Sequence, residues 1–306
     1  MAVEGEAGPP PARLPRRRRL RLDLTTPTLL GLPVAWLVVF FLVPIAIVAA
    51  YSFDVYSLFP GKHGFTLAAW REFLHSSVYL KLFWKSVKMS LLVSAIIVVL
   101  AYPLAYYLAL SGTKRKYVLL LVLIAPFLTS YLLRVLAWKV ILGDQGVINT
   151  FLFWTGLRSA DHPISQLLYS RFAVMLVLGY VWLPFVALPI FVSLESLDQR
   201  LLEAASDLGA SRLQAFRRVF LPLSLPGIAG GTLLVFILSL GFFITPALMG
   251  GPGDVMIAML IEREVEITLN WSFASALAVI LLALTLVGFV GYNRIVRLER
   301  VFEGRA

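Results

Sequence analysis

Few residues in this 306-residue chain could do chemistry, and the clearest of them lies inside a long apolar stretch. Arg134 falls within Tyr117–Leu142, where an ionisable side chain is costly in a membrane and is a functional candidate by default. Two interpretations are open. Arg134 and Lys139 snorkel to the outer headgroups as anchors, or Arg134 lines the outer mouth of a pathway, paired with Asp144. An unpaired arginine there favours an anionic or zwitterionic ligand over a cationic one.

Three glutamates argue for the opposite charge preference. Glu262, Glu264 and Glu266 follow the fifth apolar stretch, and Glu262 and Glu266 share one face if this segment is helical. A group of carboxylates attracts cations by electrostatic focusing. A solvated loop, or a surface that contacts a partner protein, explains the same pattern without a ligand.

Hydroxyl and aromatic side chains in the apolar stretches complete the candidate pathway. Aromatic faces hold ammonium groups by cation–π attraction worth about 0.5–2 kcal/mol each. Tryptophan and tyrosine are also ordinary residues of the membrane interface, which is the plainer interpretation. The candidates besides Arg134, Asp144 and Glu262 are Ser130, Tyr131, Trp138, Tyr180, Trp182, Phe242, Phe243 and Thr245.

Motifs of catalysis and metal binding are missing from the sequence. There is no G-x-x-x-x-G-K-[ST] phosphate loop, no H-E-x-x-H and no G-x-S-x-G. The chain has no cysteine, and its three histidines, His63, His75 and His162, are scattered. We therefore expect a chain that is not an enzyme, with no catalytic residue and no metal or other cofactor of its own.

Composition places the chain in a membrane. It is 59% hydrophobic and 14% charged, whereas a soluble domain carries about 25% charged residues. A span needs roughly 20 apolar helical residues, and helices satisfy their own backbone in lipid. We predict an all-α integral membrane protein with six spans, which are Leu29–Tyr51, Met89–Leu110, Tyr117–Leu142, Phe172–Leu194, Gly227–Gly250 and Trp271–Tyr292.

Basic residues predict how the spans are oriented. On one face the tails and loops carry 17 Lys and Arg, against eight on the other, so both termini are expected in the cytoplasm. Lys81, Lys85 and Lys88, on the outer face, are the exception. The predicted divisions are a basic, disordered tail over 1–26, a six-span membrane domain over 27–293, and a cytoplasmic tail over 294–306. A retained first span is favoured over a cleaved signal peptide. The arginine run at 16–19 is better explained by anionic lipid than by nucleic acid.

One polar segment, EAASDLGASRLQAFRRVFLP from Glu203 to Pro222, interrupts the apolar sequence. It lies on the predicted cytoplasmic face between spans four and five. Good helix formers over Leu201–Leu208 are followed by a break at Gly209, where glycine allows a positive φ. Ser211 can cap a second helix that runs to Phe220, before Pro222 ends it. The segment therefore predicts two short helices with a bend, although a plain amphipathic linker would give a similar pattern.

The spacing of this segment resembles the EAA loop of ABC importer permeases. That loop reads E-A-A, three residues, G, nine residues, I, one residue, L-P, and only Val219 departs from it. Pro126–Asn149 resembles the third-span region of spermidine and putrescine permeases, where Arg134, Ala137 and Trp138 precede the Ile141–Asn149 run. LAYPLAYYLA at 100–109 and LMGGPGDVMIAMLIE at 248–262 extend the likeness to about residues 84–293.

The resemblance implies that the segment is a coupling helix that docks on a cytoplasmic ATPase subunit. Small alanines permit close approach, Glu203 can pair with a basic residue, and Gly209 orients the turn. Helices this short are marginal alone in water, so a partner surface would hold them. The implied coupling residues are Glu203, Ala204, Ala205, Asp207, Gly209, Ala210, Phe216, Val219, Leu221 and Pro222.

The resemblance also implies the partners and the activity. A second permease, two ATPase subunits that use ATP and Mg²⁺, and an extracytoplasmic solute-binding protein would complete an importer of a polyamine such as spermidine or putrescine. Alternatives are an importer of another small solute (an anion, a zwitterion or a metal chelate), an ATP-independent secondary transporter and a membrane-embedded enzyme. We find neither the inverted repeats of the transporter nor the side-chain constellation of the enzyme.

Overall fold

The computed structural model describes residues 25–55, 64–110, 115–157, 164, 167–197, 200, 205 and 207–303, with backbone only at 25–30, 212 and 295–303. The predicted helix Leu201–Leu208 falls mostly outside these residues, as do Glu203 and Ala204. The chain divides into two compact units, Met1–Ile47 and Val48–Ala306.

In the first unit, the described residues form one apolar helical segment. It comprises α1 (Thr25–Leu37), a π-helical turn η1 (Val38–Leu42) and the beginning of α2 (Val43–Tyr51). Its aromatic side chains Trp36, Phe40 and Phe41 are 60–63% exposed. Because the stretch Gly31–Tyr51 is long and apolar enough to cross a membrane, lipid is the environment that suits this surface. The predicted first span is helical as expected.

The second unit is built from helices throughout its described residues. Its longest are α4 (Ser77–Leu110), α8 (Arg171–Glu195), α12 (Leu225–Leu240) and α15 (Trp271–Glu303). The shorter elements are α3 (Ala68–His75), α5 (Arg115–Ile124), η2 (Ala125–Leu128), α6 (Tyr131–Leu142), α7 (Val147–Trp154), α10 (Arg212–Ala215), η3 (Phe216–Phe220), α11 (Leu221–Leu223), α13 (Ile244–Met249), η4 (Pro252–Asp254) and α14 (Ile257–Glu266).

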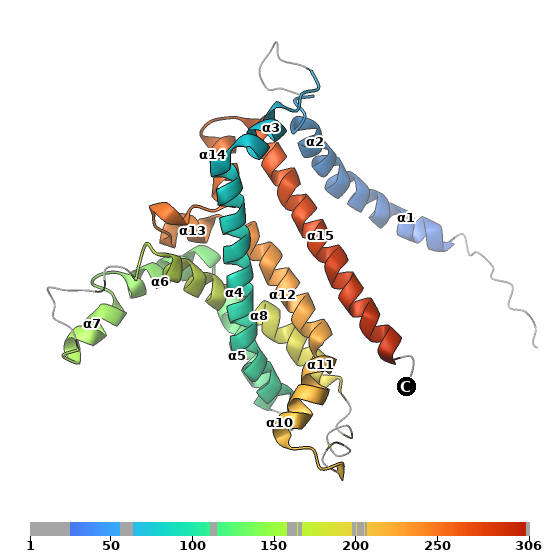
Figure 1. Cartoon of the computed structure of the whole chain (residues 1–306), viewed down its shortest axis with the longest axis vertical. Coiled ribbons are helices and arrows are strands. Elements are labelled where there is room, and N and C mark those ends of the chain that lie inside the picture. The colour runs from blue at the N-terminus through green and yellow to red at the C-terminus, as the bar shows by residue number, and fades with distance from the viewer. Residues whose placement is uncertain are drawn as a thin grey trace, which may run out of the picture. The chain divides into compact units, whose positions relative to one another are not determined.

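The centre of this unit is a three-helix block of α4, α8 and α12, which share the most extensive contacts (Figure 1). Its buried residues include Ile97 and Ala101 of α4 and Val177 and Val186 of α8. A Cβ at Gly227 of α12 would lie 2.5 Å from the Pro189 carbonyl oxygen, so this glycine lets α8 and α12 approach closely. Close backbone approach through small residues is how helices associate in membranes, where the hydrophobic effect does not drive them together.

A second apolar cluster lies at the end of the block where α4 begins. It joins α3, α14 and the start of α15 through Phe73, Ile257 and Phe273. The Ile257 backbone N–H donates to Ser86 Oγ of α4 at 2.8 Å. The elements α10 and α11 lie at the other end of α4 (Figure 1), so the two ends of the block carry different accessory elements.

Among the described residues, four helices are long and apolar enough to cross a membrane, and there are up to six spans if each of two bent helix pairs counts as one. The predicted third span is one such pair, with α5–η2 and α6–α7 inclined at 91°. Pro126 begins the η2 turn and proline disfavours a continuous helix through it, so the chain turns before α6.

The predicted fifth span, Gly227–Gly250, is not one helix. The second bent pair, inclined at 59°, runs from Leu213–Leu223 into Leu225–Leu240. α12 ends at Leu240, and α13 starts only at Ile244. In a continuous helix Pro246 would clash with the carbonyl group of Phe242, which explains the interruption.

Candidate functional site

The tip of the polar segment is an exposed turn at Gly209. This glycine has a φ of 76°, the left-handed region that non-glycine residues rarely adopt. Ala210 N–H donates to the Ala205 carbonyl oxygen at 2.9 Å, which closes the turn. Asp207 is exposed, and the Leu208 side chain is 89% exposed. The predicted bend is confirmed, and it presents an apolar side chain to the surroundings.

A reciprocal cap begins the helix that follows this turn. Gln214 N–H donates to Ser211 Oγ at 3.3 Å, and Ser211 N–H donates to Gln214 Oε1 at 2.8 Å. These two bonds satisfy backbone donors that the first turn of a helix leaves free. The predicted cap at Ser211 is therefore confirmed. The predicted stop at Pro222 is wrong, because the helical segment that follows the cap runs through Pro222 to Leu223.

The second half of the segment is anchored to α4 by aromatic rings. The π-helical turn η3 carries Phe216 and Phe220, which contact Tyr102 and Tyr106 edge-on at centroid distances of 5.4–5.7 Å. We call these four residues the loop anchor. Such pairs are worth about 0.5–1.5 kcal/mol each beyond the area they bury. The anchor therefore ties the segment to the three-helix block.

A buried hydrogen bond and an ion pair reinforce this end. The Tyr102 hydroxyl hydrogen-bonds to Ser224 Oγ at 3.0 Å, at the bend between α11 and α12. Lys116 Nζ of α5 lies 2.6 Å from Glu195 Oε1 at the last residue of α8. Val219 and Leu221, the predicted motif positions, are half-buried. The end of the block that holds the polar segment is thus cross-linked on several sides.

Arg134 lies in the first turn of α6, directly after the break at η2. Its side chain is only 9% exposed, and its buried Nε has no hydrogen-bond partner in the described part of the chain. The guanidinium lies over the rings of Phe127 and Tyr131, 5.4 and 5.6 Å from their centroids. It also lines a cavity of about 140 Å³. Arg134 is therefore a buried cation held by aromatic faces, and not a snorkelling anchor.

Several of the predicted pathway residues meet around it. Tyr131 hydrogen-bonds through its hydroxyl to Thr245 Oγ1 of α13, and its ring lies 4.6 Å from that of Phe242. Phe242 in turn contacts Trp182 of α8 at 5.6 Å. Together with Phe127 and Phe185, which contact each other at 5.2 Å, these residues form the Arg134 cluster. The sequence predicted Tyr131, Arg134, Trp182, Phe242 and Thr245 as candidates, and the fold brings them together.

Other predicted residues lie apart from this cluster. Asp144 is exposed just beyond the far end of α6, about 15 Å along the helix axis from Arg134 at 1.5 Å per residue. The predicted Arg134–Asp144 pair is therefore wrong. Tyr180, by contrast, lines the same cavity as Arg134, and its ring contacts that of Trp138 at 5.5 Å. Ser130 caps α6 without a side-chain hydrogen bond. No hydrogen bond, ion pair or ring contact of the described residues joins Phe243 or Glu262 to the cluster.

Sequence reasoning missed the residues that position these sites. Phe127 and Phe185 complete the Arg134 cluster, and Tyr102, Tyr106 and Ser224 hold the polar segment. Aromatic residues recur throughout the apolar stretches, so their type alone could not single these out. The one available signal was Pro126, whose break of the helix turns Phe127 and Arg134 toward each other.

Apolar helices joined by an exposed polar turn, with a buried cation among aromatic rings, form the architecture of a membrane transport subunit. The chain belongs to the family described as "Binding-protein-dependent transport system inner membrane component", whose model matches residues 7–301. It is 38% identical over 277 residues to the spermidine/putrescine transport system permease protein PotB of Haemophilus influenzae, covering 88% of this chain and 93% of that protein.

Further comparisons agree on the family and on the fold. The Escherichia coli protein of the same name is 38% identical over 251 residues, covering 81% of this chain and 89% of that one. A chain of a bacterial alginate ABC transporter, solved with an alginate-bound periplasmic protein, superposes with a TM-score of 0.70 at 19% identity, over 91% of this chain and 97% of that one. The chain is thus a permease subunit of an ABC importer.

Proposed function

We propose that this chain forms half of the pathway of an ATP-driven importer of polyamines. The proposal of a polyamine substrate rests on the 38% identity to spermidine/putrescine permeases over most of both chains. The residues of the Arg134 cluster are the proposed lining of this pathway. A second permease, two ATPase subunits that use ATP and Mg²⁺, and an extracytoplasmic binding protein complete the proposed complex.

The exposed turn at Leu208 and Gly209 is the proposed ATPase contact. An apolar side chain that is 89% exposed on a fixed turn gains about 1.5–3 kcal/mol when a partner cleft buries it. The loop anchor then passes the displacement of the turn to α4, in a rigid-body shift of packed helices. Glu203 and Ala204 complete the proposed contact, as the motif implies.

Co-purification of the ATPase subunit with the membrane-inserted chain tests this contact. Leu208→Ser should weaken ATPase association roughly tenfold to hundredfold, the affinity equivalent of losing that burial. Ile267→Ser is a matched control, because Ile267 is 70% exposed just after α14, at the opposite end of the block. Equal retention of the ATPase by both variants would refute the docking role of the turn.

The proposed orientation places both ends of the chain in the cytoplasm. Because the chain has no cysteine, single-cysteine variants need no altered background. Leu208→Cys should react with a membrane-impermeant maleimide only after the membrane is opened, and Val78→Cys, 67% exposed at the start of α4, should react in intact cells. The reverse pattern would overturn the orientation and, with it, the coupling role.

Uptake by the reconstituted complex tests the substrate. Spermidine and putrescine should accumulate in proteoliposomes in an ATP-dependent manner, and an anionic solute of similar size should not. The buried, carboxylate-free Arg134 is the specific observation that favours a second candidate, an importer of an anion or a zwitterion. Uptake of the anionic solute alone would establish that alternative and discard the polyamine.

A further inference from the structure

Three lysines follow one face of α4 where the helix begins. Lys81, Lys85 and Lys88 stand at i, i+4 and i+7, so that their side chains share a face. Like charges at these spacings destabilise an isolated helix by a few tenths of a kcal/mol per pair. They also depart from the charge distribution of the rest of the chain. Negatively charged groups outside this helix are therefore needed to offset the repulsion among the three lysines.

Only part of this charge is balanced within the protein. Lys85 Nζ donates to the Gly253 carbonyl oxygen at 2.7 Å, and Arg171 Nε of α8 donates to Asp254 Oδ1 at 3.3 Å. These bonds hold the η4 turn against α4 and α8. Lys81 and Lys88 are exposed and have no hydrogen-bond or ion-pair partner in the described ranges.

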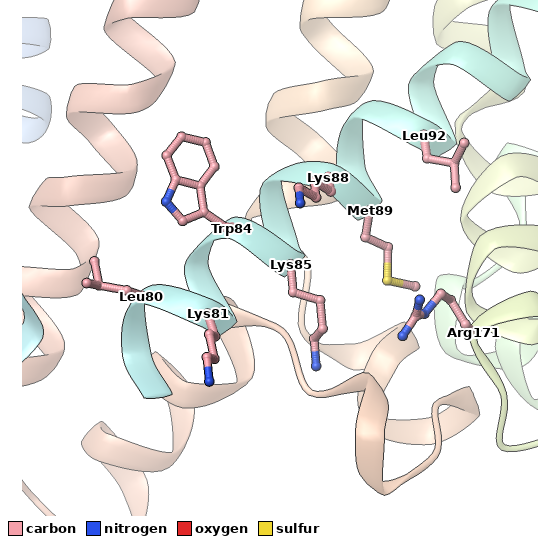
Figure 2. A pocket seen from close by; sticks show the side chains of 8 residues that line it. All are labelled: Leu80, Lys81, Trp84, Lys85, Lys88, Met89, Leu92 and Arg171. Carbon is pink, nitrogen blue, oxygen red and sulfur yellow. The ribbon is translucent and has the colours of Figure 1, made fainter. Parts of the chain in front are cut away.

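The four cations line one open groove of about 690 Å³, and the described residues that line it include no carboxylate. Figure 2 shows Lys81 and Lys85 extending from α4 in the same direction, with the Arg171 guanidinium reaching toward Met89. Trp84, which is 57% exposed, completes the rim. Indole rings prefer the level of lipid headgroups. We call this the basic groove.

An exposed apolar stripe continues the same face of α4 below the cations. Leu92, Ile96 and Val99 are 48%, 39% and 70% exposed, within the charge-free stretch Met89–Leu110. α4 has 34 residues and is therefore about 51 Å long, whereas the hydrocarbon core is about 30 Å thick. The lysines thus fall at headgroup level when the charge-free stretch spans the core.

We propose that the basic groove binds the phosphate of an anionic glycerophospholipid, whose acyl chains lie along the apolar stripe. Cations above an exposed apolar face on one helix complement an anionic amphiphile. An acidic soluble protein would match the charges but leave the stripe uncovered. A bound lipid would join α4, α8 and the η4 turn, and this role does not depend on which solute is carried.

Native mass spectrometry of the full-length chain in detergent tests the proposal. Three probes are added: phosphatidylglycerol, phosphatidylcholine with the same acyl chains, and glycerol phosphate. Phosphatidylglycerol should remain bound and the zwitterionic lipid should not. Lys81→Gln combined with Lys88→Gln should raise the half-saturating concentration of phosphatidylglycerol roughly thirtyfold, because about 1 kcal/mol per surface cation corresponds to about fivefold for each lysine.

Two further double variants make the result interpretable. Arg71→Gln with Arg263→Gln removes the same charge from exposed residues of α3 and α14 outside the groove, and should leave binding unchanged. Lys81→Arg with Lys88→Arg keeps the charge and should retain the lipid, which separates lost affinity from lost folding. Equal binding of both lipids, equal loss in the Arg71/Arg263 variant, or full competition by glycerol phosphate would each overturn the lipid site.

Discussion

The contact between α8 and α12 gives the sharpest stability prediction, because three neighbouring glycines differ in the space around them. A Cβ at Gly227 would lie 2.5 Å from the Pro189 carbonyl oxygen, at Gly231 3.0 Å from Val186 Cα, and at Gly230 3.4 Å from the Tyr292 hydroxyl oxygen. Ordinary contacts of a Cβ lie at 3.4–4 Å. The backbone atoms that face Gly227 and Gly231 cannot move aside as easily as the end of the Tyr292 side chain that faces Gly230.

Alanine at each of the three positions therefore separates crowding from helix propensity. All three substitutions gain up to about 1 kcal/mol of propensity, since all three glycines lie inside α12. Overpacking costs about 1–3 kcal/mol, and only Gly227→Ala and Gly231→Ala incur it. The free energy of unfolding should be highest for Gly230→Ala, lower for Gly231→Ala and lowest for Gly227→Ala, with about 1–3 kcal/mol between the highest and the lowest.

Thermal unfolding of the purified chain in detergent, followed by circular dichroism, measures this order. Gly230→Ala is the internal control, with the same chemical change on the same helix. If Gly227→Ala melts at or above the temperature of Gly230→Ala, then α8 and α12 do not approach as closely as described. The packing argument for the three-helix block would then fail.

Three further substitutions test the loop anchor and the Arg134 cluster. Tyr102→Phe should lower the free energy of unfolding by about 1 kcal/mol through loss of the bond to buried Ser224, and unchanged denaturant midpoints would contradict that bond. Phe220→Ala should cost about 3–5 kcal/mol because the ring is 4% exposed, and should uncouple ATP hydrolysis from uptake even where the ATPase still binds. Arg134→Met should leave the melting temperature of the isolated chain unchanged or higher, because it removes a buried charge without a counter-ion, while solute uptake falls; a lower melting temperature would show that Arg134 stabilises the fold.

Local signals in the sequence were sufficient for some features. The left-handed turn at Gly209 and the cap at Ser211 depend on backbone chemistry within a few residues, and both were predicted. Four of the predicted spans lie within apolar helices of the expected type. Residues inside the predicted spans, the broken third and fifth included, were also the right ones to suspect for the Arg134 cluster, since burial of an ionisable residue always needs an explanation.

Features that depend on distant residues could not be predicted. The helix breaks before Arg134 and at Gly241 lie near Pro126 and Pro246, but other prolines, such as Pro184, lie inside a continuous helix, so proline alone does not mark a break. The supposed Arg134–Asp144 pair ignored the length of α6. Phe185 and Ser224 act through residues far away in the chain, and no local pattern marks them.

The loop anchor has a mechanical consequence. The polar segment follows α8 in the chain and leads into α12, and its Phe216 and Phe220 rings also contact α4. A displacement of Leu208 would therefore act on all three helices of the block at once. Because these three helices pack closely on one another, we expect the block to tilt as a rigid body. The segment formed by α5, η2 and α6 turns by 91° just before Arg134 and packs on this block less extensively than α4, α8 and α12 pack on one another. If ATPase binding displaces the block, we expect the bend between η2 and α6 to act as the hinge. Movement there would change the surroundings of a solute near Arg134.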